Sequence, residues 1–99
     1  MRCYVYLLRS LKDSKFYLGW TTDIRRRLDE HNAGLIRSTK GRRPFELIHF
    51  ETYLGPVLAK ARERVLKRSP RMLHYFKKRA RLCSSIPPPR GGGTKEVVG

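Results

Sequence analysis

The chain has 99 residues, enough for one domain with a modest hydrophobic core and too few for a separate specificity domain. Its 23 Lys and Arg residues against eight Asp and Glu give a net charge of +15, so the expected partner is a polyanion, above all nucleic acid. The two Cys residues suggest neither a zinc site nor a disulfide framework, and the first apolar run, Cys3 to Leu8, is too short to span a membrane. We therefore expect a cytoplasmic location, no membrane attachment and no protein partner readable from the sequence.

The first two predicted elements form a β-hairpin. Residues Arg2 to Arg9 alternate with a period of two in residue types that favour strands. Turn-forming residues from Ser10 to Lys15 lead into a second, antiparallel strand from Phe16 to Thr21. Tyr6 and Tyr17 then face each other or lie diagonally across the hairpin, an arrangement that is also common for packing reasons alone.

A glycine and a helix follow this hairpin. Gly19 either marks a plain strand end or leaves room for a phosphate backbone to approach. If the Asp23 side chain caps a helix, one stripe of that helix contains Ile24, Leu28, His31 and Leu35, with Arg27 on its border. An arginine turned towards a packed face needs a carboxylate or another anion as a partner. Arg27 is therefore the arginine that requires an explanation.

A basic loop and a third strand come next. The loop from Ala33 to Pro44 contains four cations that either are simply solvated or contact phosphate, namely Arg37, Lys40, Arg42 and Arg43. Residues Phe45 to Tyr53 are apolar on both alternating sets, which predicts a third strand that is covered on both faces.

Two helices are predicted after Gly55-Pro56. The apolar stripe of the first is expected to contain Leu58, Ala61 and Val65, together with Ala59 and Leu66. Glu63 is expected just outside that stripe, as the only acidic side chain between Glu51 and Glu96. It is either a helical ion-pair partner of Lys67 or an acid kept for function.

The last helix is expected to begin at Ser69-Pro70 and to end near Leu82, with Leu73, Phe76 and Ala80 facing the core. From Ser84 the composition shifts to runs of Pro and Gly. The sequence therefore predicts a folded domain over residues 1–83 and a disordered tail over residues 84–99.

These residues include the groups that phosphodiester hydrolysis requires: a base for water, charge relief at phosphorus and help for the leaving oxygen. Glu63 offers a hard oxygen ligand for Mg²⁺ or Mn²⁺, and Arg27 a permanent cation for the phosphate oxygens. Tyr6 can act as the base if nearby cations lower its pKa, with His31 as the competing base or a proton relay.

Two tripeptides and their spacing carry a resemblance to a known family. Tyr4-Val5-Tyr6 precedes Tyr17-Leu18-Gly19, and ten and fourteen residues after Tyr17 come Arg27 and His31. This pattern resembles the GIY-YIG nuclease superfamily, in particular its small stand-alone members, over roughly Arg2 to Arg81. Tyr4 stands where glycine is usual.

The resemblance implies an α/β (α+β) fold with a small three-stranded antiparallel sheet and about three helices. It also implies DNA cleavage with one divalent metal held by Glu63, and a catalytic set of Tyr6, Tyr17, Arg27, His31 and Glu63. Trp20 departs from the residue often seen after the second tripeptide, and either stacks on a base or packs. Many members have an asparagine in the helical region after the glutamate, whereas no asparagine follows Asn32 here.

Three functional hypotheses follow. The first is a metal-dependent DNA endonuclease, with structured or damaged DNA in repair or recombination as a candidate substrate. The second is a nucleic-acid-binding module of the same fold with weakened or lost turnover, which the missing asparagine favours. The third, an RNA-binding structural protein, leaves the matching spacings of Arg27, His31 and Glu63 unexplained.

Overall fold

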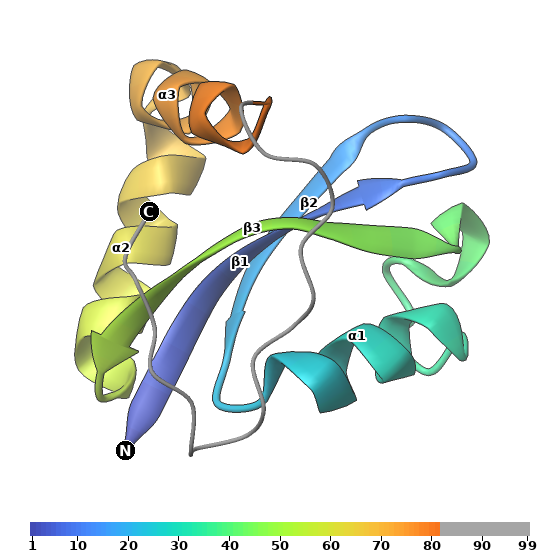
Figure 1. Ribbon diagram of the computed structural model, residues 1–99, viewed down its shortest axis with the longest axis horizontal. Helices are drawn as coiled ribbons and strands as arrows, with labels where there is room; N and C mark the ends of the chain where they lie inside the picture. Colours follow the sequence, from blue (N-terminus) through green and yellow to red (C-terminus); the bar gives the residue numbers. More distant parts are fainter. Residues whose placement is uncertain (82–99) are drawn as a thin grey trace.

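Three antiparallel strands form the middle layer of the molecule, in the order β2-β1-β3 (Figure 1). The strands are β1 (Arg2–Ser10), β2 (Phe16–Thr21) and β3 (Phe45–Leu54). The helices are α1 (Ile24–Asn32), α2 (Pro56–Arg68) and α3 (Pro70–Arg81), with a short 3₁₀ helix, η1 (Lys40–Arg42), before β3. The expected fold class is therefore confirmed. The structure is a computed structural model that describes residues 1–81, so the predicted tail over residues 84–99 lies outside it.

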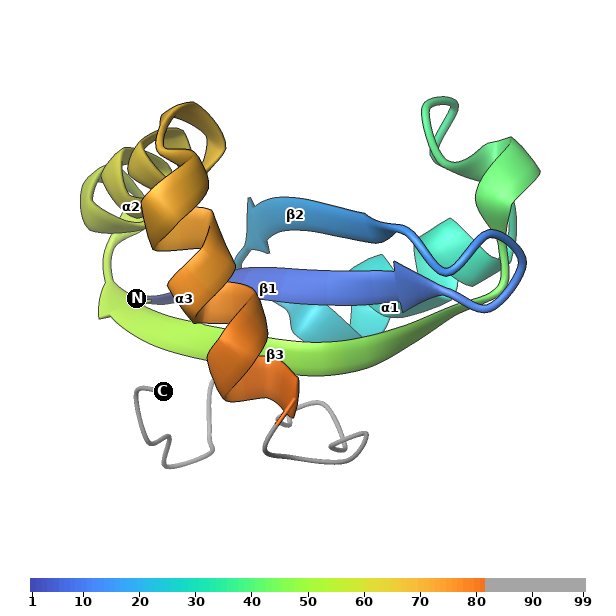
Figure 2. The same cartoon turned by 90° about the horizontal axis from the view of Figure 1, so that it is seen from above.

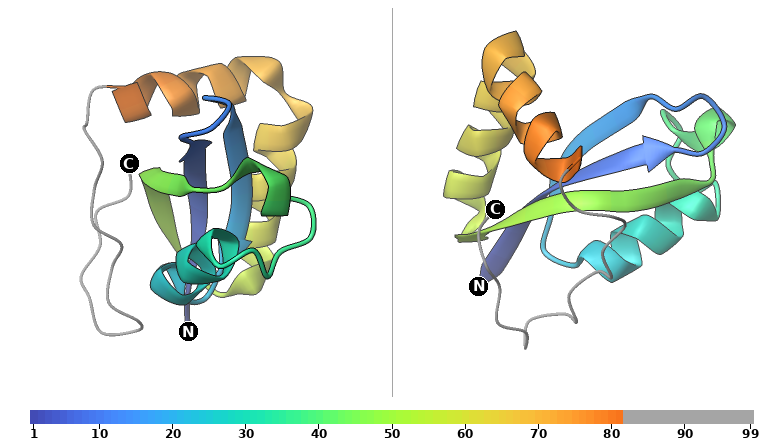
Figure 3. Two further views of the ribbon diagram at one scale, coloured as in Figure 1. Left: turned by 90° about the vertical axis from the view of Figure 1, so that its right-hand side faces the viewer. Right: turned by 45° about the horizontal axis from the view of Figure 1, so that its top comes forward.

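Strand β1 is the central strand, and its alternating side chains supply both hydrophobic cores. Cys3, Val5 and Leu7 pack against α2 and α3, where Ala59, Leu66 and Phe76 complete the first core. The intervening residues face α1 and form the second core, which contains Tyr4, Tyr6, Leu8, Ile24, Phe45 and Leu47. Figure 3 shows this layering, with α1 on one side of the sheet and α3 on the other. A strand buried on both faces explains why β1 is apolar at consecutive positions.

The strand register places the two tyrosines of the motif diagonally. Tyr6 lies opposite Gly19, while Tyr17 lies opposite Leu8. On the other side of β1 the register to β3 shifts between Leu7 and Leu8, so Leu7 pairs with His49 and Leu8 with Leu47. This irregularity leaves Ile48 as an extra residue of β3, as in a β-bulge.

Helix α1 begins as its sequence predicts and ends earlier than its apolar stripe suggests. The Asp23 side chain accepts a hydrogen bond from the Arg26 backbone N–H at 3.1 Å, which confirms the expected cap. Ile24 and His31 are buried, but Leu35 is 72% exposed. The expectation that Leu35 continues the stripe is wrong, because the helix ends at Asn32 and Gly34 follows with φ +80°.

Helix α2 buries only part of the expected apolar stripe. Ala59 and Leu66 are fully buried, whereas Leu58 and Val65 are 54% and 45% exposed. On a helical wheel, Glu63 lies between Ala59 and Leu66, three or four residues from each, so this acid belongs to the inward stripe.

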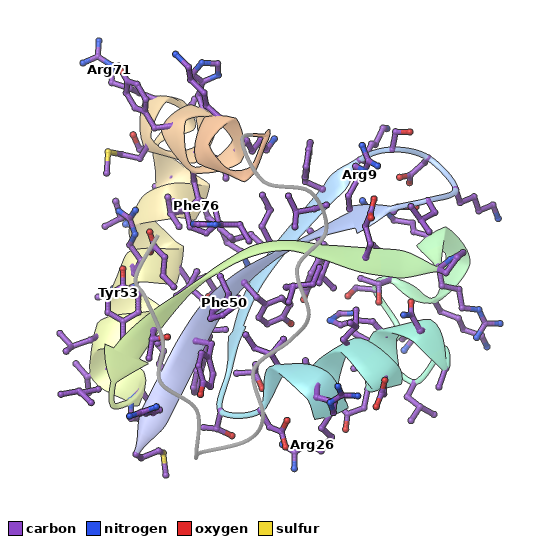
Figure 4. All side chains as sticks on the ribbon, in the orientation of Figure 1. Arg9, Arg26, Phe50, Tyr53, Arg71 and Phe76 are labelled. Carbon is purple, nitrogen blue, oxygen red and sulfur yellow. The ribbon has the colours of Figure 1, made fainter. Side chains whose placement is uncertain are left out.

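Helix α3 crosses the sheet on the same face as α2 (Figure 2). The Ser69 hydroxyl accepts a hydrogen bond from the Met72 N–H at 3.3 Å, in the way expected of a helix cap. Phe76 is 1% exposed and points from α3 towards the sheet (Figure 4). Ala80, also expected in the core, lies outside the described side chains. Among the described residues, the helices are all too short or too polar to cross a membrane.

Candidate active site

Tyr6 lies in the middle of β1 and its ring crosses over Gly19. A Cβ atom added to Gly19 would lie 2.7 Å from the Tyr6 Oη and 2.9 Å from its Cζ, well inside contact distance. The phenol therefore fills the space above this glycine, and Tyr6 is only 2% exposed. Gly19 lies inside β2, so the reading as a plain strand end is wrong, and its missing side chain allows the Tyr6 hydroxyl to extend across the strand.

His31 connects Tyr6 to the loop that follows α1. Its Nε2 lies 3.1 Å from the Tyr6 Oη, and its Nδ1 lies 2.7 Å from the Thr39 Oγ1. The Thr39 hydroxyl also lies 3.4 Å from the Ile36 carbonyl, to which it can donate its proton. We assign the neutral tautomer in which Nδ1–H donates to Thr39 and Nε2 accepts from Tyr6, since this satisfies every group.

The imidazole of His31 is enclosed by aromatic rings. The Tyr17 ring centroid lies 4.9 Å from that of His31, and the Phe45 centroid lies 5.7 Å away on an adjoining element. Tyr17 is also 6.3 Å from the Tyr6 ring. The diagonal register of the hairpin therefore brings both motif tyrosines to the same histidine.

Burial fixes the protonation states of this group. Burial, followed by the positive charge of Arg27, lowers the pKa of His31 to about 4. Burial, followed by the neighbouring Tyr17 phenol, raises the pKa of Tyr6 above its ordinary value, although Arg27 acts in the opposite direction. The downward shift expected for Tyr6 is thus wrong, because desolvation outweighs the nearby cation. Near neutral pH, Tyr6 is protonated and His31 is neutral.

Arg27 meets both an acid and the phenol. Its Nη1 donates to the Glu30 Oε1 at 3.1 Å, and its hydrogen bond to Tyr6 is one of the influences on the phenol's pKa. The side chain is still 36% exposed. The carboxylate that this arginine needed is therefore Glu30, three residues further along α1, while part of the guanidinium faces solvent.

Glu63 comes from α2, on the other side of the sheet from α1. Its carboxylate is close enough to raise the pKa of Tyr6, although burial of the phenol and its two other neighbours have larger effects. The Glu63 Oε2 also lies 3.6 Å from the Lys67 Nζ. Of the two alternatives for Glu63, the ion pair with Lys67 is present, and a functional role of the same carboxylate stays a prediction. The Glu63 side chain is 21% exposed.

The donor set fits a hard divalent cation only in part. Among residues 1–81, no three His, Cys, Asp or Glu side chains come together as a ready metal cage. Mg²⁺ is commonly held by one or two carboxylates, with water and substrate phosphates completing its octahedron. Glu63, partly exposed and rich in oxygen, meets that requirement, whereas a zinc-type site of several protein ligands does not.

The predicted nucleic-acid-binding residues are less uniform. Arg42 bonds to Asp13 at 3.0 Å and to the Phe16 carbonyl at 3.2 Å, so it joins η1 to the β1–β2 turn. The Arg43 guanidinium covers Gly34, where an added Cβ would collide with it. Trp20 is half-buried in the first core, with the Lys60 Nζ 5.3 Å from its ring centroid. Arg37, Lys40 and Arg43 are exposed.

Two contributing residues do not emerge from the sequence analysis. Glu30 was visible as a carboxylate three residues after Arg27, a spacing that allows a helical pair. Thr39 is 0% exposed and lies in a loop that looks solvated, so no local signal indicates its contact with His31.

The sequence of this chain is similar to a known family and to several curated proteins. The model of the GIY-YIG catalytic domain matches residues 2–78. A UPF0213 protein of Haloquadratum walsbyi is 43% identical over 65 residues, covering 65% of this chain and 72% of its own length. A UPF0213 protein of Streptococcus pneumoniae is 38% identical over 71 residues, which is 71% of each chain.

A solved structure is also similar. The solution structure of the UPF0213 protein BH0048 from Bacillus halodurans is 34% identical, covers 79% of this chain and 84% of its own, and has a TM-score of 0.49. The family match spans the sheet, α1 and α2, and so includes all five predicted site residues. With that match over most of its length, the chain belongs to the GIY-YIG family and has a nuclease-type catalytic domain.

Proposed function

We propose that this chain is a divalent-metal-dependent endonuclease that hydrolyses phosphodiester bonds in DNA. The observation that carries the proposal is the chain of contacts from Tyr6 through His31 to Thr39, with Arg27 beside it. A histidine with both ring nitrogens engaged, next to a buried phenol, is a proton relay as well as a packing unit.

The relay assigns a role to each residue. As the water oxygen bonds to phosphorus and the P–O3′ bond breaks, the water's proton passes to the Tyr6 Oη. The original phenol proton moves to the His31 Nε2, which accepts it in the resting tautomer. Thr39 holds the imidazole in that tautomer, and Tyr17 encloses it. The leaving 3′ oxygen takes a proton from bulk water, and His31 later returns its extra proton to solvent through Tyr6. The products are a 3′-hydroxyl and a 5′-phosphate.

Charge decides when this relay operates. In the free protein the raised pKa of Tyr6 and the lowered pKa of His31 oppose the proton transfer. A phosphate anion bound by Arg27 would offset the positive charge that helps to lower the pKa of His31, and would so favour the protonated imidazole. Arg27 can contact the non-bridging oxygens through its exposed part, and the relay then becomes active only with substrate present.

Glu63 is the residue that would hold Mg²⁺ or Mn²⁺. The bound cation would polarise the phosphate and stabilise the leaving oxygen. The exposed loop cations Arg37, Lys40 and Arg43 are proposed to contact the backbone phosphates of the substrate. Repair or recombination of structured or damaged DNA is the proposed setting.

A nucleic-acid-binding module without turnover is the second candidate. The Glu63–Lys67 pair at 3.6 Å favours it, because an ammonium group beside the carboxylate competes with a metal ion. The two candidates differ in one assay: labelled linear and branched DNA and RNA are incubated with the purified chain and Mg²⁺ or Mn²⁺, with and without chelator. Cleavage that the chelator stops and Tyr6→Phe slows supports the nuclease. Binding without cleavage on every substrate would leave only the module.

A further inference from the structure

More than half of the net positive charge of this protein comes from one segment, the helix pair α2–α3. The segment of α2 and α3, residues 56–81, contains ten Lys and Arg residues and one acid, Glu63, a net charge of +9 out of the chain's +15. The segment of α1 with its cap, residues 23–32, contains three Arg residues and three acids, a net charge of zero. The field that attracts a polyanion therefore originates mainly from the helix pair α2–α3.

Most acids of the described chain are already engaged elsewhere. Asp13 pairs with Arg42, Glu30 with Arg27, Glu46 with Arg9 and Glu51 with Arg62. Within residues 1–81, no carboxylate pairs with four exposed cations of the helix pair: Arg64, Arg68, Arg71 and Lys78. Figure 4 shows Arg71, at the start of α3, extending away from the body of the protein. These side chains are free to meet phosphates at little desolvation cost.

An aromatic ring lies among these cations. Tyr75 is 55% exposed, and it is four residues after Arg71 and three before Lys78, so all three lie on one face of α3. His74 lies beside it, with ring centroids 6.0 Å apart. Proteins that bind single-stranded nucleic acid combine exposed aromatic rings, on which bases stack, with basic side chains that contact the phosphates. This face of α3 offers both.

The same charges lead back to the candidate site. Lys67, one turn after Glu63, is bonded to that carboxylate at 3.6 Å, and Arg64 and Arg68 adjoin these two along α2. Lys60 lies over the Trp20 ring at the β2 edge, 5.3 Å from its centroid. The basic face thus begins at the proposed metal ligand and continues outward along both helices.

We propose that the outer face of α2–α3, comprising Arg64, Arg68, Arg71, Tyr75 and Lys78, is a nucleic-acid-binding surface for one flank of the substrate. The proposal rests on the proposed function for the position of the scissile bond. It specifies a substrate with an unpaired segment on that flank, where Tyr75 stacks on a base. On the α1 side, the contacts to phosphate come instead from the loop cations proposed above, Arg37, Lys40 and Arg43.

The test compares two triple variants of the full chain. Arg68→Gln/Arg71→Gln/Lys78→Gln removes three charges from the proposed surface. The matched control, Lys15→Gln/Arg25→Gln/Arg26→Gln, removes three exposed charges from the β1–β2 turn and α1. Fluorescence anisotropy with a labelled single-stranded oligonucleotide in EDTA measures affinity across a salt titration without any cleavage.

The surface variant should lose at least about tenfold in affinity near 0.1 M salt, and its slope of log K against log [salt] should fall by about 2, or about 0.7 for each lost contact. The control should change by less than about threefold. Tyr75→Ala should weaken binding to single strands about tenfold while leaving the salt slope unchanged.

Each outcome has one meaning. Equal losses in the two triple variants would overturn the surface and indicate diffuse attraction by net charge. A wild-type chain that binds no oligonucleotide would overturn both this surface and the proposed function. A chain that binds through this surface yet never cleaves with Mg²⁺ or Mn²⁺ would retain the surface and refute the nuclease alone.

Discussion

Replacing Gly19 with alanine tests how Tyr6 is held. The new Cβ would lie 2.7 Å from the Tyr6 Oη and 3.2 Å from the Tyr17 Cε2, where ordinary contacts begin at 3.4 Å. To restore ordinary contact the phenol must move by about 0.7 Å. Its close-packed surroundings oppose that movement, because the ring is buried. Overpacking of this kind costs about 1–3 kcal/mol of stability.

The functional effect of Gly19→Ala should exceed the stability effect. The hydrogen bond between Tyr6 and His31 is 3.1 Å long, so a shift of this size strains or breaks it. A displacement approaching 1 Å at a reacting group can cost about a hundredfold in rate. We expect cleavage to fall by about that factor in a folded protein.

The assay for Gly19→Ala combines thermal melting with cleavage rates, and Gly41→Ala is its control. A Cβ at Gly41 would meet nothing within 4 Å, so that variant should keep its activity and its melting temperature within about a degree or gain slightly. A Gly19→Ala protein with wild-type stability and activity would refute the claim that Tyr6 is fixed by this close approach.

Two further predictions concern buried ionisable groups. The pKa of His31 falls to about 4 on folding, so below about pH 6.5 the unfolded chain binds a proton that the folded chain does not bind. The free energy of unfolding should therefore decrease by up to about 3 kcal/mol as the pH is lowered from 6.5 to 4. Denaturant unfolding of wild type and His31→Gln at both pH values measures this, and an unchanged pH dependence in the variant would assign the effect elsewhere. The Glu51 carboxylate, 3% exposed, bonds to Arg62 at 2.9 and 3.2 Å. Glu51→Leu should cost about 3–5 kcal/mol, and adding Arg62→Leu should recover most of it; a double variant no more stable than the single one would contradict this reading.

The hairpin, the α1 cap and the sheet were predictable because their signals are local. Alternation in Arg2–Arg9, the turn that follows it and the Asp23 cap each depend on neighbours a few residues apart. The same is true of the spacing that brings Arg27 and His31 onto the inner side of α1. The register that places Gly19 under Tyr6 is not local, since it follows from strand pairing.

The inward face of α2 was not predictable from periodicity. The apolar positions Leu58 and Val65 lie outside, while the inward stripe contains two charged residues, Arg62 and Glu63. Arg62 faces inward because a buried carboxylate, Glu51 on β3, meets it. An ion pair between residues that are eleven positions apart and lie on different elements cannot be detected from the pattern of apolar residues.

We propose above that Glu63 holds the metal ion that acts together with the Tyr6–His31 relay. The most direct measurement is cleavage by purified Glu63→Ala, with DNA affinity and melting temperature determined on the same protein and Glu63→Gln as the isosteric control. If Glu63 holds the metal, both variants lose metal-dependent cleavage. Their DNA affinity should be equal or slightly higher, because a negative charge has been removed. Loss of the ion pair with Lys67 should cost only about a few tenths of a kcal/mol of stability. Full cleavage by either variant, from preparations free of contaminating nuclease, would contradict the metal-ligand assignment and the mechanism built on it.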